Sequence, residues 1–140
     1  MPRMTYGALA STELVAECKF DDAIAQASRE IAAQPDEPEA WFNRGQALTG
    51  LGRFAEAAAD YEKALALDAS ASGLDPEAAD DELFFALRNI ALSQKDRPEE
   101  AIATLERYRR VLPEGRHIGD IKTWEDHIKG VEVVWVRESA

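Results

Sequence analysis

Three stretches of this chain carry apolar residues at helical spacing. They cover residues 20–31, 54–65 and 101–112. In each stretch the apolar side chains recur three or four residues apart, which places them along one face of an α-helix. Each stretch is therefore predicted to be an amphipathic helix that packs its apolar face against a neighbouring helix.

The three stretches share a small residue near their start: Ala23, Ala57 and Ala101. The first two alanines are 34 residues apart and the last two are 44 apart. Two helices that pack closely in a hairpin need a small residue where they cross, and a stack of hairpins repeats that need at a fixed period. The spacing therefore predicts three stacked hairpins, with about ten residues inserted before the third.

Capping signals divide the chain further. Asp75, for example, offers an N-cap acceptor directly before Pro76 and Glu77, which favour the first turn of a helix. This start lies early in the insertion, so we expect that helix to project about two turns beyond its neighbours, after a link at residues 70–73. The predicted helices are 5–17, 21–33, 37–50, 54–69, 76–95 and 98–112.

The last part of the chain permits two structures. Its apolar positions suit an amphipathic helix from 118 to 130, with a possible continuation to 136, that would cap the open end of the stack. Residues 131–136, VEVVWV, are β-branched and nearly alternating, which suits a strand. A third hypothesis is that residues 131–140 fold back into a groove of the stack or extend to a neighbouring molecule.

Residues 41–69 resemble a tetratricopeptide repeat (TPR). The fit is weaker in repeat one (residues 4–37), where Gly7 stands in place of the usual Trp. In repeat three, Phe85 stands at the Trp position, and Arg88 and Asn89 replace the usual Leu and small Gly. The matching positions of repeat two are Trp41, Gly45, Leu48, Phe54, Ala57, Tyr61, Ala64 and Ala69.

The resemblance implies an all-α fold: a right-handed α-solenoid of three TPR helix hairpins with a C-terminal capping helix. Residues 1–140 then form one domain. Its parts are repeat one (4–37), repeat two (38–69), an insertion (70–81), repeat three (82–113) and the cap (114–140).

The resemblance also implies a function, because the first helices of TPR hairpins line a concave groove that receives a peptide or helix of another protein. The chain is accordingly expected to be a non-enzymatic adaptor or scaffold. The alternatives are a self-associating structural protein and an accessory subunit of a larger complex. By position, the groove would be lined by Leu9, Thr12, Glu39, Phe42, Asn43, Gln46, Thr49, Leu83, Leu87 and Ile90.

One TPR subclass grips the C-terminal carboxylate of chaperones with lysine, asparagine and arginine. At the corresponding positions this chain has Ala8, Thr12, Asn43, Leu83 and Leu87, so only the asparagine is present. Without a cation to pair with a carboxylate, that clamp is not expected. The side-chain amides of Asn43 and Gln46 are instead predicted to bond the backbone of an extended ligand.

Charge and composition restrict the classes of partner that the chain is expected to bind. The chain has 16 basic and 27 acidic residues, a net charge of −11. This balance argues against nucleic acid and anionic membranes, whose binding relies on Lys and Arg, and favours partly apolar or basic protein segments. Neither a membrane span nor a secretory signal is expected. Because Cys18 is the only cysteine, no internal disulfide can form, and a cytoplasmic location is expected.

No catalytic motif accompanies this pattern. His117 and His127 are ten residues apart, unlike the paired histidines of helical metal sites. Cys18 is expected at a turn, with Lys19 as its only nearby activating group. Trp124 is expected to serve the core of the cap rather than a contact. The sequence predicts no enzymatic activity, no cofactor and no metal site.

Overall fold

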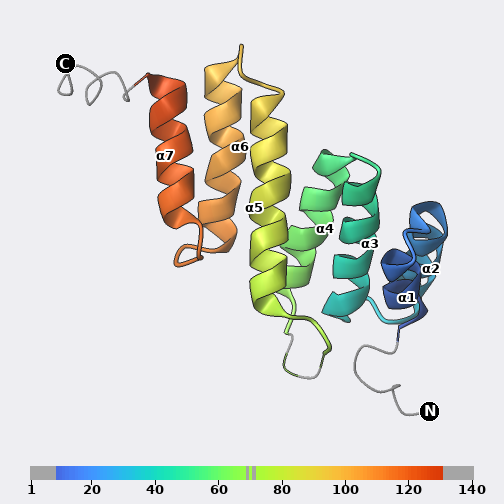
Figure 1. The fold of residues 1–140 in the computed structure, drawn as a ribbon. Helices are drawn as coiled ribbons and strands as arrows, with labels where there is room; N and C mark the ends of the chain where they lie inside the picture. The colour runs from blue at the N-terminus through green and yellow to red at the C-terminus, as the bar shows by residue number, and fades with distance from the viewer. Residues whose placement is uncertain (1–8, 69, 71, 131–140) are drawn as a thin grey trace.

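The structure is a computed structural model that describes residues 9–68, 70 and 72–130. These residues form helices and no strand, which confirms the predicted all-α solenoid. Successive helices pack as antiparallel neighbours and the pairs stack in chain order, with α7 at the end (Figure 1). The helices are α1 (Ala10–Ala16), α2 (Phe20–Ala33), α3 (Pro38–Gly50), α4 (Phe54–Ala66), α5 (Pro76–Leu92), α6 (Pro98–Val111) and α7 (Ile118–Lys129).

Most predicted helix ends are correct within a residue or two, but α4 and α5 end earlier than expected. After α4, the carboxylate of Asp68 accepts a hydrogen bond from the backbone N–H of Ser70 (2.9 Å), which favours a turn over further helix. After α5, the Ser93 hydroxyl donates to the carbonyl of Ile90 (2.6 Å) and satisfies a terminal acceptor.

The described part of the chain begins at residue 9 and ends at residue 130. The first predicted helix began at residue 5, but Leu9 is extended (φ −68°, ψ 137°) and α1 begins at Ala10; residues 1–8 lie outside the described part of the chain. The predicted helix 118–130 is observed as α7, which ends at Gly130 with a φ of 80°. The alternatives for residues 131–140 (helix, strand or fold-back into a groove) also lie outside the described residues.

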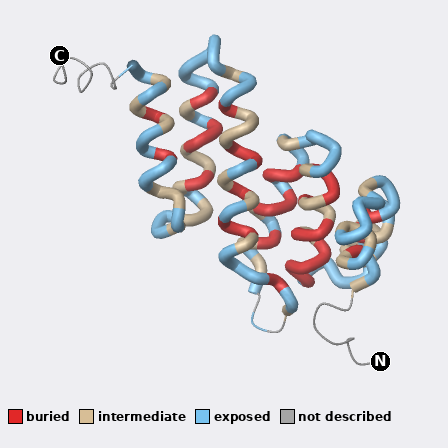
Figure 2. Tube along the Cα trace, in the orientation of Figure 1, coloured by how far each residue is buried: buried red, intermediate tan, exposed pale blue. Residues whose placement is uncertain are grey.

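The hydrophobic core lies where neighbouring helices cross. Ala23, Ala57 and Ala101 are all fully buried, as the hairpin spacing predicts. Buried positions are concentrated on α3 and on the inner sides of α4, α5 and α6 (Figure 2). The helix α3 contacts α1, α2, α4 and α5, which is why even polar residues along it have little exposed surface.

Tyr61 of α4 fills a tight crossing with α3. Its ring is fully buried against Phe42, with the ring centroids 5.7 Å apart, and its hydroxyl lies 2.8 Å from Oγ1 of Thr49. A Cβ atom added at Gly45 would lie 2.6 Å from Cε1 of Tyr61. The glycine therefore lets α3 and α4 approach closely enough to enclose the ring.

The insertion contributes to the fold as well as to chain length. It lengthens α5, which begins at Pro76 as expected, with the Asp75 side chain accepting from the N–H of Glu77. Leu74 is buried in the core, and the Ser72 hydroxyl donates to Glu37 at the start of α3 (2.6 Å). This segment thus connects the second and third hairpins.

The last helix covers α6. Ile121 is fully buried, and Trp124 and Ile128 are half-buried against the same core. Arg109 of α6 donates to Glu125 of α7 (2.6 Å), a charged contact at the edge of this interface. None of the described helices is long and apolar enough to cross a membrane.

Replacing Gly45 with alanine tests the α3–α4 crossing. Alanine favours an exposed helix by about 1 kcal/mol over glycine. At this site the added methyl group overlaps Tyr61, so we expect a net loss of about 1–3 kcal/mol in the free energy of unfolding, measured by urea denaturation.

Gly119→Ala in α7 is the matched control, because an added Cβ there meets no atom within 4 Å. It should leave stability unchanged or raise it slightly. Equal effects of the two substitutions would contradict the close approach at Gly45.

Candidate protein-binding surface

The ten residues predicted to line a groove divide evenly by exposure. Leu9, Thr12, Gln46, Thr49 and Ile90 are half-buried and retain some surface. The other five lie inside the fold, so in this conformation a partner has little or no access to their side chains. These buried residues are Glu39, Phe42, Asn43, Leu83 and Leu87.

The buried amide of Asn43 joins the first two hairpins. Its Nδ2 atom donates to the hydroxyls of Ser11 and Thr12, both at 2.9 Å. Those hydroxyls in turn donate to the carboxylates of Glu30 (2.5 Å) and Glu39 (2.9 Å). The amide expected to bond a ligand is thus used between α1 and α3, because a buried polar group must find its partners within the fold.

Gln46 is also used internally. It donates a hydrogen bond to Glu82 of α5, while burial raises the pKa of the Glu82 carboxyl above its ordinary value. The expected pair of ligand-binding amides, Asn43 and Gln46, therefore makes contacts between neighbouring helices.

In the third hairpin, α5 is rotated about its own axis relative to the predicted orientation. The sequence placed Phe85 at the buried aromatic position and Leu83 and Leu87 in the groove. In the structure it is Phe84 that packs on Tyr108, with ring centroids 6.1 Å apart, and Leu83 and Leu87 are fully buried. Phe85 is 37% exposed.

The outward face of α5 consequently carries residues that sequence reasoning missed. Phe85 and Leu92 are seven residues apart, which places them on one helix face, and Arg88 lies between them. Leu92 is 43% exposed. The signal was present in the sequence, since Arg88 and Asn89 depart from the repeat pattern at positions that were expected to be apolar and small.

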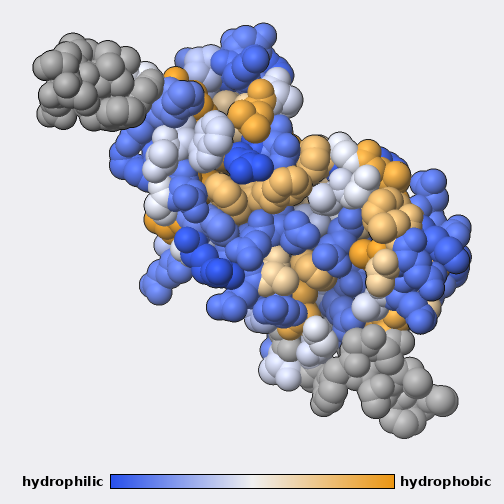
Figure 3. Space-filling view, viewed as in Figure 1, coloured by the Kyte–Doolittle hydropathy of each residue, from blue (hydrophilic) through white to orange (hydrophobic). Residues whose placement is uncertain are grey.

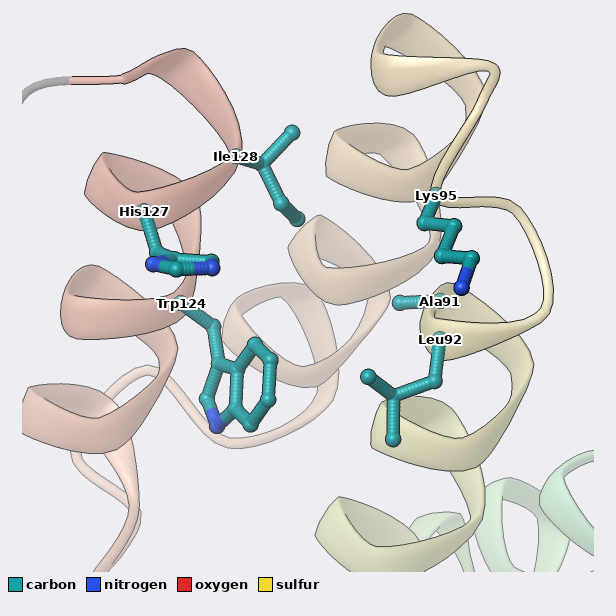
Figure 4. A pocket seen from close by; sticks show the side chains of 6 residues that line it. All are labelled: Ala91, Leu92, Lys95, Trp124, His127 and Ile128. Atoms are coloured by element: carbon teal, nitrogen blue, oxygen red, sulfur yellow. The ribbon is translucent and has the colours of Figure 1, made fainter.

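A cleft opens beside this face, between α5 and α7. Figure 4 shows Leu92 and Trp124 projecting toward each other across it. Its volume is about 250 Å³. Apolar patches also interrupt the hydrophilic surface seen in Figure 3. The cleft is lined by Ala91, Leu92, Lys95, Trp124, His127 and Ile128.

Arg88 lies on the same face and has no charged partner among the described residues. Its guanidinium carbon is 5.4 Å from the centroid of the Phe85 ring, within the range of a cation–π contact. Its Nε atom is buried without a hydrogen-bond partner. An unpaired buried N–H is uncommon. Because Nε is enclosed, a ligand would bind the terminal nitrogens of the guanidinium, which pair with no described residue.

His117 joins α5 to α7 at the opposite end of these helices. Nε2 lies 2.7 Å from Asp81 and Nδ1 lies 2.8 Å from Asp120, while the ring stacks on Phe84 at 4.3 Å. Burial lowers the pKa of His117, but the hydrogen bonds to Asp81 and Asp120 outweigh it, so the pKa lies above the usual value of about 6.5. The imidazolium form can donate to both carboxylates at once.

Asp80, Asp81 and His117 offer ligand atoms within 4.8 Å of one another, a spacing that a cation could bridge. Internal contacts already use these atoms. Asp80 accepts from the Tyr108 hydroxyl (2.5 Å) and from the backbone N–H of Arg116 (3.1 Å). Asp81 also pairs with the Arg116 side chain at 3.3 Å. The arrangement is explained as a structural ion-pair network.

Comparison with known proteins agrees with the repeat pattern. Residues 9–72 match the family model described as tetratricopeptide repeat. Over 70 residues the chain is 41% identical to the Hsp70-Hsp90 organizing protein of Triticum aestivum. The aligned region is 50% of this chain but only 12% of that protein. No solved structure matches the chain.

Titration of His117 should appear in the pH dependence of stability. Because its pKa is raised in the folded chain, the contribution of His117 is complete below about pH 6.5 and is lost as pH rises through the folded-state pKa. We expect His117→Gln to destabilise the chain more at pH 5.5 than at pH 8.5, measured by urea unfolding of both proteins. A difference that stays constant between these pH values would contradict the bridge to Asp81 and Asp120.

Replacing Asn43 tests whether its amide serves the fold. Asn43→Ala should lower the free energy of unfolding by about 1–3 kcal/mol, because the buried hydroxyl of Ser11 and the half-buried hydroxyl of Thr12 lose their donor. Hydrogen exchange of α1 should speed up most. Asn89→Ala is the control, since that side chain bonds only the Phe85 carbonyl of its own helix (2.8 Å). Equal losses in both variants would refute a special role for Asn43.

Proposed function

Because residues 9–72 match the tetratricopeptide-repeat family model, we propose that the chain is a non-enzymatic adaptor that binds a segment of another protein. The binding surface is the face of the solenoid formed by α5 and α7. The half-buried members of the predicted groove, on the first two hairpins and α5, are proposed as further contacts. They are Leu9, Thr12, Gln46, Thr49 and Ile90.

The observation that carries the proposal is the exposure of Leu92 in the cleft and of Phe85 two turns earlier on the same helix, where its ring meets Phe54 of α4 edge-on at 5.8 Å. They are two of the three large apolar side chains that are exposed among the described residues. Contiguous exposed apolar area beside a concave site is typical of protein-binding surfaces, and aromatic side chains often supply their strongest contacts.

The relative supports a protein partner without naming one for this chain. Its printed name describes a protein that organizes Hsp70 and Hsp90. The chain corresponds to a small part of that protein, and cations are missing from the clamp positions Thr12, Leu83 and Leu87. We therefore propose a protein ligand, and not the chaperone carboxylate clamp.

Self-association through the same face is the second candidate, because a second copy would also cover Phe85, Leu92 and the cleft. The molecular mass in solution distinguishes self-association from an adaptor role. Self-association requires the mass measured by analytical ultracentrifugation to rise with protein concentration, and Leu92→Ser should abolish that rise. An adaptor should stay at 15.5 kDa over the same range.

A photo-crosslinking residue at position 92 tests the proposed surface in the native host. We expect position 92 to capture one or more specific proteins, and a second change, Phe85→Ser, to reduce that capture. Placing the same crosslinker at Arg110, an exposed position of α6 outside the cleft, gives the control. Equal capture at both positions, or none at position 92, would refute the proposal.

A further inference from the structure

We propose that the partner segment is apolar and carries an acidic side chain, and that this carboxylate pairs with Arg88 beside the α5–α7 cleft. This inference rests on the proposed function and specifies its ligand. It keeps the apolar character expected from the sequence and replaces the basic alternative, which net charge favoured, with an acidic one.

The ion pairs of the other partly buried arginines set Arg88 apart. Arg44 holds Asp60 through two bonds of 2.8 and 2.9 Å, and these join α3 to α4. Arg107 holds Glu62 in the same way, at 3.0 and 2.8 Å, and joins α6 to α4. Arg88 is partly buried and close to the core as well, yet it makes no ion pair within the described part of the chain, and its Nε is buried without a partner.

The surroundings of Arg88 would strengthen a bond to a carboxylate. Phe85 lies one helical turn before it and Leu92 one turn after it, so apolar groups flank the guanidinium on both sides. A partner that covers these side chains also excludes water from the charge, and a charged hydrogen bond is stronger where the local dielectric is low. Asp81, seven residues earlier on the same helix, is already held by His117 and Arg116.

The cleft adds apolar contact and a second positive charge. Trp124 and Leu92 form its two walls (Figure 4). Lys95 at its edge is exposed and forms no ion pair with the described residues. No residue that lines the cleft is acidic, although the whole chain has a net charge of −11.

The arrangement of the helices gives the segment a place to lie. α6 contacts both α5 and α7, whereas α5 and α7 do not pack directly on each other along their length. His117 joins α5 to the start of α7, while Leu92 and Trp124 lie toward the other end. An apolar side chain of the partner would enter between Leu92 and Trp124, and an acidic residue nearby in the same segment would reach Arg88.

A peptide library tests this chemistry directly. Its members are 12-residue peptides that carry an uncharged fluorophore and have both ends capped, so that the only carboxylate is a side chain. Each carries two leucines or phenylalanines at varied spacing and one glutamate. Three matched sets replace that glutamate with glutamine, with lysine, or with glutamine plus a free C-terminal carboxylate. Binding is measured by fluorescence anisotropy with the full chain.

We expect the best glutamate peptides to bind on the order of tenfold more tightly than their glutamine counterparts. Arg88→Gln should remove that preference, and Arg88→Glu should shift it toward the lysine peptides. Arg110→Glu makes the same charge change on an exposed part of α6 and should leave the preference intact. Circular dichroism checks that each variant keeps its helices.

Three results would overturn the inference: no binding by any peptide, equal binding by the glutamate and glutamine peptides, or a glutamate preference that survives both Arg88 substitutions. Stronger binding of the peptides with a free C-terminal carboxylate would overturn the side-chain source of the charge. Crosslinking at position 92 separates these failures from failure of the proposed function. Specific capture there, combined with charge-independent peptide binding, would retain the adaptor and reject only the acidic ligand.

Discussion

The close approach of α3 and α4 around Tyr61 is the contact on which the rest of the stack depends. The ring is fully buried, and Gly45 faces it with no room for a side chain. The same ring packs on Phe42 and reaches Thr49, so it fixes how α3 lies against α4. The neighbouring hairpins then pack on this pair. Any change that separates α3 from α4 would therefore also disturb the spacing of the helices that form the proposed binding surface.

Polar contacts between hairpins fix the relative positions of helices that apolar packing alone does not determine. Asn43 links α1 to α3, Ser72 links the insertion to α3, and Arg107 links α6 to α4. Such bonds are directional, and a buried polar group that loses its partner destabilises the fold. The same rule draws attention to Arg88, because its buried Nε lacks the partner that comparable groups in this chain possess. The inferred acidic ligand would pair with the terminal nitrogens of the same guanidinium.

The candidate site was harder to predict than the helices that carry it. The repeat pattern assigned groove positions by analogy, and five of those ten side chains proved to be buried. Asn43 is an example. Its amide has the chemistry of a ligand contact, but Ser11 and Thr12 occupy it, and they come from a different hairpin. A sequence pattern records residue types and does not record which partner each polar group finds.

Local interactions determined much of the fold, since periodicity, alanine spacing and capping residues act within one helix or one hairpin. These signals correctly predicted an all-α stack, the early start of α5 at Pro76 and a helix from 118 that covers α6. Tertiary packing decided which face of α5 points outward. Phe84 and Phe85 are chemically identical and differ by about 100° around the helix axis. Contacts of Phe84 with Tyr108 and His117, on later segments of the chain, turn Phe84 inward and leave Phe85 beside Arg88 on the surface.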